Sequence, residues 1–283
     1  MADYPSAPLT HSHHILDDGT VAFRCSKDKD AWPWLALAPA HPIIIQTLNY
    51  WAFVETSQAR GGVDARTGGA LTYSRWYSGK AGVGPIDHGI AEEPKPDESG
   101  KRQHWTMTFF DAEGRLVSRL YGSGVIFRER DFAAWRDEAK HKMPMPQDAS
   151  AFMYAGPEAL GVASHTECFL SPLLTREPPT AEALVARDKA FIPNHPYHGG
   201  SGDHVNAHQL ADSAMQFAHL VKRQGRLRCI GGEMAFKHFV ELDRPFTLEQ
   251  SETDGASGAL SLTVTQEATL CTAITLLVEP LRD

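Results

Sequence analysis

A long apolar helix followed by alternating strands occurs twice along the chain, and this limits the fold more than any other feature. Ile43–Arg60 has apolar residues at helical spacing and ends at Gly61-Gly62, and a second such run follows Asp203. Strand-like segments come after each helix. We expect each antiparallel sheet to wrap its own helix and the two sheets to join edge to edge. The sequence therefore predicts an α+β fold built from two similar halves.

Periodicity and turn residues predict the individual elements. The clearest is a hairpin of His104–Phe110 and Arg115–Phe127 around a Gly-containing turn. Residues 1–18 are expected to be loosely ordered, and Gly84–Gln103 to form an exposed flap. Further strands are predicted at Thr20–Cys25, Ala70–Ser78, Gly161–Leu170, Leu227–Leu242, Phe246–Glu252, Ala259–Gln266 and Thr269–Val278, with short helices at 130–140 and around Ala181–Ala190.

The segment MPMPQD, between Lys142 and Ser150, interrupts regular structure. A break of this kind near mid-chain predicts an N-terminal domain at 1–145 and a C-terminal domain at 146–283. One large α+β domain is the alternative.

Composition excludes several classes of partner. The net charge is −8 and the basic residues do not cluster, which argues against nucleic acid and anionic membranes. No apolar run is long enough to cross a bilayer, and the start of the chain does not resemble a signal peptide. The four cysteines are widely spaced, as is typical of free thiols. We expect a cytoplasmic protein without a cofactor.

The stretch from His195 to Gln216 is the strongest candidate for a site. It holds four histidines and two aspartates, with glycines that free the loop to take positive φ. Asp203 is predicted to cap the helix that follows. The start of a helix offers unpaired backbone N–H groups, which suit a carbonyl oxygen or an anion.

A histidine fourteen positions before an acidic residue occurs twice, as His41 to Glu55 and His198 to Asp212. Asp212 also begins a D-x-x-x-Q pattern that ends at Gln216. In these respects the chain resembles the hotdog superfamily, and more closely the β-hydroxyacyl thioester dehydratases and the double-hotdog dehydratase domains of polyketide synthases. The resemblance implies a tandem, or double, hotdog. The family's H-x3-G-x4-P motif is incomplete, because Ile45 and Tyr50 follow His41 and Ala207 replaces the proline after His198.

Two other hotdog patterns fit the same loop. Gly202-Asp203-His204-Val205-Asn206 resembles the loop of four-hydroxybenzoyl-type thioesterases. Ser201-Gly202-Asp203 with Asn206 and His208 is similar to the Asp/His pair of R-specific enoyl hydratases. All three patterns place the active residues within 195–216.

The dehydratase resemblance implies a lyase that removes water from (3R)-hydroxyacyl-CoA or acyl carrier protein thioesters, or adds it to enoyl thioesters. Histidine suits the base, and a carboxyl group enclosed by apolar walls suits the acid. By this resemblance the pairs cross the halves, His41 with Asp212 and His198 with Glu55, and we expect one active site at most. A thioesterase would instead use Asp203, Asp212 or Glu55 to activate water. Gln216 would orient that water, His208 is a further catalytic candidate, and Gly200, Gly202, Asn206 and Ala207 would bind substrate.

Other functions, and purely structural roles for the same residues, are alternatives. His204 and His208 have the i, i+4 spacing of helical zinc ligands, which would suit a metal-dependent hydrolase completed by Asp212 or His198. A non-catalytic acyl-binding protein is a further possibility. His41 could serve only as a cap, and Glu55 could pair with Arg60. A tandem hotdog supplies its own paired sheet, so a monomer or a homodimer fits.

Overall fold

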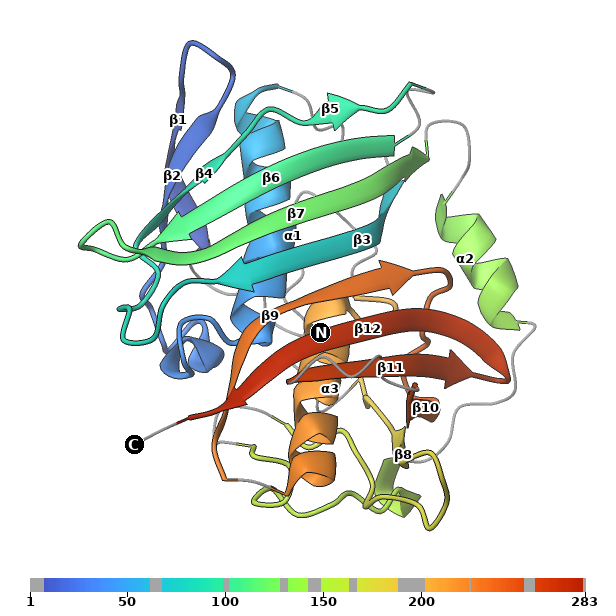
Figure 1. The fold of residues 1–283 in the computed structure, drawn as a ribbon. Coiled ribbons are helices and arrows are strands. Elements are labelled where there is room, and N and C mark those ends of the chain that lie inside the picture. Colours follow the sequence, from blue (N-terminus) through green and yellow to red (C-terminus); the bar gives the residue numbers. More distant parts are fainter. Residues whose placement is uncertain are drawn as a thin grey trace.

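The computed structural model describes residues 8–61, 68–98, 102–127, 132–141, 149–162, 167–187, 202–223, 225–251 and 258–281. One large sheet dominates the structure, and two long helices lie against the same face of it (Figure 1). These helices are α1 (Pro42–Ala59) and α3 (Ala207–Lys222). A shorter helix, α2 (Phe132–His141), lies at the sheet's side, and Pro33–Ala36 and Ala149–Ala151 form 3-10 turns.

In the part of the chain that the structure describes, the sheet has twelve strands, in the order β1-β2-β4-β6-β7-β3-β9-β12-β11-β10-β8, with β5 paired to β6. They are β1 (Thr10–Ile15), β2 (Val21–Cys25), β3 (Gly68–Ser78), β4 (His88–Ala91), β5 (Lys95–Pro96), β6 (Arg102–Phe110), β7 (Leu116–Phe127), β8 (Thr180–Ala183), β9 (Leu227–Phe236), β10 (Phe246–Gln250), β11 (Ala259–Gln266) and β12 (Thr269–Pro280). All ladders are antiparallel, and each half of the chain contributes one continuous side of the sheet.

The two sides join where β3 pairs with β9. Tyr73 lies opposite Ala235, and the ladder runs to Tyr77 opposite Gly231. This is the predicted edge-to-edge junction, so the α+β prediction of two helices, each wrapped by an antiparallel sheet, is confirmed. The predicted boundary between 1–145 and 146–283 lies within 142–148, which are outside the described residues. The domain division therefore stays a prediction.

Polar contacts fix α1 against its sheet. Trp105 Nε1 on β6 donates to Asn49 Oδ1 (2.9 Å), and Ser74 Oγ on β3 donates to Gln46 Oε1 (3.1 Å). Trp105 packs directly over Gly122 of β7, where a Cβ atom would lie 2.2 Å from the indole. These buried bonds tie the rotation of α1 to the sheet.

Four predictions for individual segments were wrong. At the start of the short helix expected around Ala181–Ala190, residues Thr180–Ala183 instead form β8, because β10 offers unpaired backbone groups that outweigh alanine's helical preference; 188–190 lie outside the described residues. In Gly161–Leu170 the described residues form only an isolated bridge from Leu170 to Ala183. Part of the expected flap at Gly84–Gln103 is β4, between β2 and β6. Residues 10–15, expected to be loose, form β1.

The start of α3 also differs from the prediction. Asn206, with φ −82° and ψ 164°, is the N-cap, and its backbone N–H donates to Gln209 Oε1 (2.8 Å) in a capping box. Asp203 is not the cap. Val205 N–H bonds to Val240 O (2.8 Å), which keeps the residues before Asn206 out of the helix. Among the described residues, no helix is long and apolar enough to cross a membrane.

Candidate active site

The N-terminus of α1 is where the two halves bring polar groups together. His41 is the N-cap of α1, and its Nδ1 accepts a long hydrogen bond from Ile43 N–H (3.3 Å). Pro42 follows at the first helical position, where a missing N–H costs nothing. The capping contact turns the other ring nitrogen, Nε2, away from the α1 backbone.

That nitrogen lies 4.0 Å from Asp212 Oδ1 of α3. The gap is too long for a direct hydrogen bond, and it suits a single oxygen atom that contacts both groups. The Asp212 side chain is 5% exposed and that of His41 is 19% exposed, so the pair is largely buried but reachable. The structure thus brings together one of the two pairs that the dehydratase resemblance implied.

Gln216, one turn after Asp212, holds the carboxyl group in place. Its Oε1 accepts from Phe169 N–H (2.9 Å), and its Nε2 donates to Glu167 O (2.8 Å) and to Asp212 Oδ2 (3.2 Å). A side chain fixed at both ends by backbone groups cannot easily rotate. Asp212 therefore keeps its other oxygen, Oδ1, directed toward His41.

Burial moves the two pKa values in opposite directions. It raises the pKa of Asp212 to about 7, although the hydrogen bond from Gln216 lowers it. Burial and, to a smaller extent, the charge of His219 together lower the pKa of His41 to about 4. At neutral pH the histidine is uncharged and the carboxyl is close to half protonated. Groups of this kind can exchange protons with a substrate between them.

Two residues beside this pair were missed by the sequence analysis. His219 follows Asp212 by seven positions on α3, close enough for its charge to act on His41. Cys168 lies near Asp212, since burial and then the charges of Glu167 and Asp212 raise the pKa of its thiol. The helical spacing of Asp212, Gln216 and His219 could have indicated the histidine, whereas nothing local in the sequence indicated Cys168.

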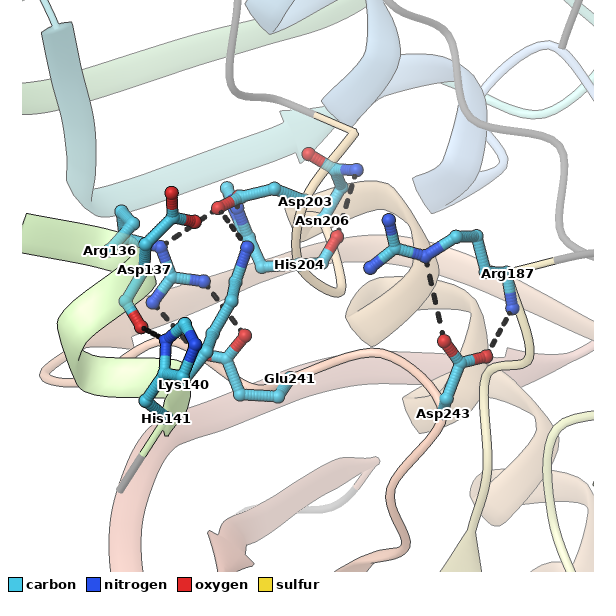
Figure 2. A network of polar contacts seen from close by, with 10 residues as sticks. All are labelled: Arg136, Asp137, Lys140, His141, Arg187, Asp203, His204, Asn206, Glu241 and Asp243. Atoms are coloured by element: carbon cyan, nitrogen blue, oxygen red, sulfur yellow. Dashed lines mark hydrogen bonds and ion pairs between the residues drawn. The ribbon is translucent and has the colours of Figure 1, made fainter. Parts of the chain in front are cut away.

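Asp203, a candidate catalytic residue, lies in a separate polar network, which Figure 2 shows. Arg136 of α2 donates from Nε to Asp203 Oδ2 (3.0 Å) and from its other two nitrogens to both Glu241 oxygens (2.7 and 2.8 Å). Lys140 Nζ and His204 Nδ1 also contact Asp203. Arg136 and Glu241 are almost fully buried, with side-chain exposures of 4% and 6%.

This network decides what Asp203 can do. Burial raises the pKa of Asp203, but the hydrogen bonds from His204 and Lys140 and the charges of His204 and Arg136 outweigh it, so the pKa is well below the usual range. A carboxylate of such low basicity is a poor general base. Its visible contribution is to anchor the segment before α3 to α2.

The remaining candidates are dispersed. Glu55 lies about 20 Å along α1 from its start, taking 1.5 Å per residue, and its charge acts on His13 of β1. Arg60 donates to the backbone oxygens of Gly19 and Ala91. His198 and Gly200 lie outside the described residues.

The candidates around the start of α3 are close in sequence but differ in environment. Gly202, Asn206 and Ala207 are half-buried, and His208 is buried with 5% exposure. His204 precedes the helix and packs on Phe239, so it does not share a helical face with His208 as a zinc pair would. No group of three His, Cys, Asp or Glu side chains suited to a metal occurs in the described residues.

Solved structures supply the comparison. An acyl-ACP thioesterase from Bacteroides thetaiotaomicron aligns over 92% of this chain and 97% of its own, with a TM-score of 0.55 and 10% identity. A putative oleoyl thioesterase from Lactobacillus plantarum aligns over 86% and 90%, with a TM-score of 0.51 and 11% identity. The 12:0-ACP thioesterase from Umbellularia californica aligns over 87% and 93%, with a TM-score of 0.50 and 8% identity.

The chain has a double hotdog fold. The double hotdog fold implied by the resemblance is confirmed, because the alignments cover nearly the whole length of this chain and of the aligned proteins. At these identities the similarity establishes the fold alone. No protein-family model matches the chain, and no curated protein matches it by sequence.

Proposed function

We propose that this double hotdog protein is an acyl-thioester hydro-lyase, which dehydrates (3R)-hydroxyacyl thioesters or hydrates the corresponding enoyl thioesters. One observation carries the proposal: His41 and Asp212 come from different halves, face each other across 4.0 Å and have oppositely shifted pKa values. The gap fits the substrate's hydroxyl oxygen or the attacking water.

In the dehydration direction, His41 Nε2 takes the proton from the α-carbon, and the C–H electrons form the new double bond. The C–O bond at the β-carbon breaks, and Asp212 gives its proton to the departing hydroxyl, which leaves as water. The imidazolium then returns its proton to the carboxylate across the same gap. The backbone N–H of Ala207, at the start of α3, is the proposed donor to the thioester oxygen, since the N–H of Asn206 is bonded to Gln209.

This route requires the neutral ring to carry its proton on Nδ1. In that tautomer His41 gives up the hydrogen bond from Ile43 N–H, which at 3.3 Å is a weak one. The cost is about 1 kcal/mol, small beside the barrier reduction expected from a positioned base.

A thioesterase is the second candidate, and the same capping contact favours it. While Nδ1 accepts from Ile43, the ring proton lies on Nε2, where it can donate to a carbonyl oxygen but cannot act as a base. Asp212, with its pKa near 7, would then be the general base for water. The structures aligned above are named as thioesterases, which agrees with this alternative.

Mass spectrometry of reactions with enoyl-, 3-hydroxyacyl- and saturated acyl-CoAs separates the candidates. A hydro-lyase changes the thioester by one water and leaves it intact, whereas a thioesterase releases free CoA. A repeat with the same acyl groups on acyl carrier protein identifies the preferred carrier. CoA release from all three classes without any gain or loss of water would overturn the hydro-lyase proposal.

The pH dependence of kcat/KM gives a second, independent test. In the hydro-lyase, Asp212 must be protonated and His41 neutral, so kcat/KM is highest between about pH 4 and 7 and falls above 7. In the thioesterase, Asp212 must be ionised, so kcat/KM rises through pH 7. The Asp212→Asn variant has no carboxyl to titrate. Its kcat/KM should therefore show neither the fall nor the rise near pH 7.

A further inference from the structure

Arg244 is a buried arginine in the connection between β9 and β10 that the proposed chemistry does not use. It is 9% exposed, and its buried Nη1 has no hydrogen-bond partner. Leu242 and Phe246 on either side of it are buried apolar residues. A buried guanidinium without a counter-charge destabilises a fold, so such a residue calls for an explanation.

The charged side chains near Arg244 in the sequence and their partners form ion pairs with one another. Glu241 is held by Arg136 through two hydrogen bonds, and Asp243 lies 3.5 Å from Arg187 Nε (Figure 2). Asp203 is shared by Arg136 and Lys140. In this part of the described chain, three carboxylates therefore face three paired cations, and Arg244 is the one cation left without an anion.

The turn that carries Arg244 is tied to the start of α3. Val205 N–H bonds to Val240 O, and Gln266 Nε2 donates to the backbone oxygens of both Glu241 and Arg244. The two hydrogen bonds from Gln266 restrict the motion of this turn, and the Val205–Val240 bond holds it near the residue that precedes Asn206. Asp212 follows Asn206 by six residues, which is about 9 Å along α3 at 1.5 Å per residue.

We propose that Arg244 binds an anionic oxygen group of the substrate, and so forms a specificity site in the turn that is bonded to the segment before α3. A guanidinium offers planar donors that fit a carboxylate or a phosphate. The group is either a carboxylate on the acyl chain or a phosphate of the carrier arm. This inference rests on the proposed acyl-thioester function, and its test includes a measurement that needs no turnover.

The first measurement is binding to the unreacted protein. Wild type, Arg244→Met and the control Arg187→Met are heated with glutarate, inorganic phosphate, free coenzyme A or no addition. An anion that binds the folded state alone raises Tm. We expect one of the anions to raise the Tm of wild type and of Arg187→Met but not of Arg244→Met. Without anion, Arg244→Met should melt no lower than wild type, since it removes an unpaired buried charge.

The second measurement compares kcat/KM for four substrates. A short enoyl group with a terminal methyl or a terminal carboxylate is placed on CoA or on N-acetylcysteamine, which lacks phosphate. If Arg244 binds the acyl carboxylate, wild type prefers the carboxylated substrates on both carriers by roughly 10- to 100-fold, and Arg244→Met loses that preference. If it binds a carrier phosphate, the preference is for CoA with either acyl group.

Several outcomes would overturn the inference. They are Tm shifts that are the same in Arg244→Met and wild type, substrate preferences that Arg244→Met leaves unchanged, and a parallel loss in Arg187→Met. If none of the thioesters is turned over but the anion-dependent Tm shift still requires Arg244, the catalytic proposal fails while the anion site stands.

Discussion

The helices α1 and α3 occupy matching places in the two halves, yet they carry different chemistry. The N-cap is His41 in α1 and Asn206 in α3. At the sixth helical position α1 has Thr47 and α3 has Asp212. The structure pairs the cap of α1 with the sixth residue of α3, so one site combines the histidine of one half with the acid of the other.

The reciprocal pair would be Asn206 with Thr47, and neither side chain titrates near neutral pH. Thr47 Oγ1 donates to Ile43 O within its own helix (2.7 Å), and Asn206 belongs to the capping box of α3. These residues serve local structure. The comparison teaches that the symmetry of the fold is not a symmetry of function, and that a single proton-transfer site is to be expected.

The largest effect is expected from making the two caps alike. His41→Asn keeps a good N-cap residue, so the free energy of unfolding should change by less than about 1 kcal/mol. The variant loses the proton-accepting ring, and kcat should fall by roughly 10²- to 10⁴-fold. Steady-state kinetics and urea denaturation measure the two quantities. Full activity in His41→Asn would mean that His41 is only a cap and that the two helix starts are equivalent.

The polar network of α2 is the next difference between the halves. Arg136→Met leaves Glu241 and Asp203 without their buried partner and should cost about 3 to 5 kcal/mol of stability. The control is Arg119→Met, which removes an ion pair with Glu92 whose two side chains are 59% and 48% exposed, and should cost less than about 1 kcal/mol. Equal losses in the two variants, measured by denaturant unfolding, would contradict the structural role given to Arg136.

The acid of α3 should also make stability depend on pH. The carboxyl of Asp212 has an ordinary pKa of 3.8 in the unfolded chain and about 7 in the folded one. Between these values the folded state keeps a proton that the unfolded state has released, so this group lowers the wild-type stability as pH rises from about 4 to 7.

Asp212→Asn has no such group. Its free energy of unfolding relative to that of wild type should therefore increase over the same pH range, by up to about 4 kcal/mol at pH 8. Denaturant unfolding at several pH values gives the difference. The control is Thr47→Asn at the matching position of α1, whose stability relative to wild type should not vary with pH. A constant difference between Asp212→Asn and wild type would show that Asp212 ionises normally.

The smallest effects belong to the reciprocal pair. Asn206→Ala removes a helix cap and should cost about 1 kcal/mol of stability. Thr47→Val removes a hydroxyl bonded within α1 and should cost about as much. Neither variant should lower kcat by more than roughly 10-fold, because neither removes a proton donor or acceptor. A loss as large as that of His41→Asn would indicate a second active site.

Short-range patterns predicted much of the fold. Alternation along β6, β7, β11 and β12, and the apolar spacing of α1 and α3, arise from contacts with one sheet or helix face. β8 could not be predicted in this way, because its conformation depends on pairing with β10, more than 60 residues later in the chain. The partners of Asp203 are equally non-local, since Arg136 precedes it by 67 residues.

Spacing along the chain was a poor guide to equivalent positions. His41 to Glu55 and His198 to Asp212 span the same number of residues, but α1 begins directly after His41, whereas α3 begins nine residues after His198. Glu55 and Asp212 consequently lie at different depths along their helices. Counting from each helix start matches Asp212 with Thr47 instead. This count requires the correct helix starts, and the N-cap of α3 was predicted at Asp203 but is Asn206.

The joining of β3 to β9 within a single chain also has an evolutionary consequence. In a dimer of identical subunits every mutation appears twice, so a histidine or an acid can be lost only from both sites at once. Here the two halves can change independently, so one pair of helix positions can carry His41 and Asp212 while the matching pair carries Thr47 and Asn206. Selection can then act on Thr47 and Asn206 for the stability of their own helices alone, without any constraint from the chemistry of His41 and Asp212.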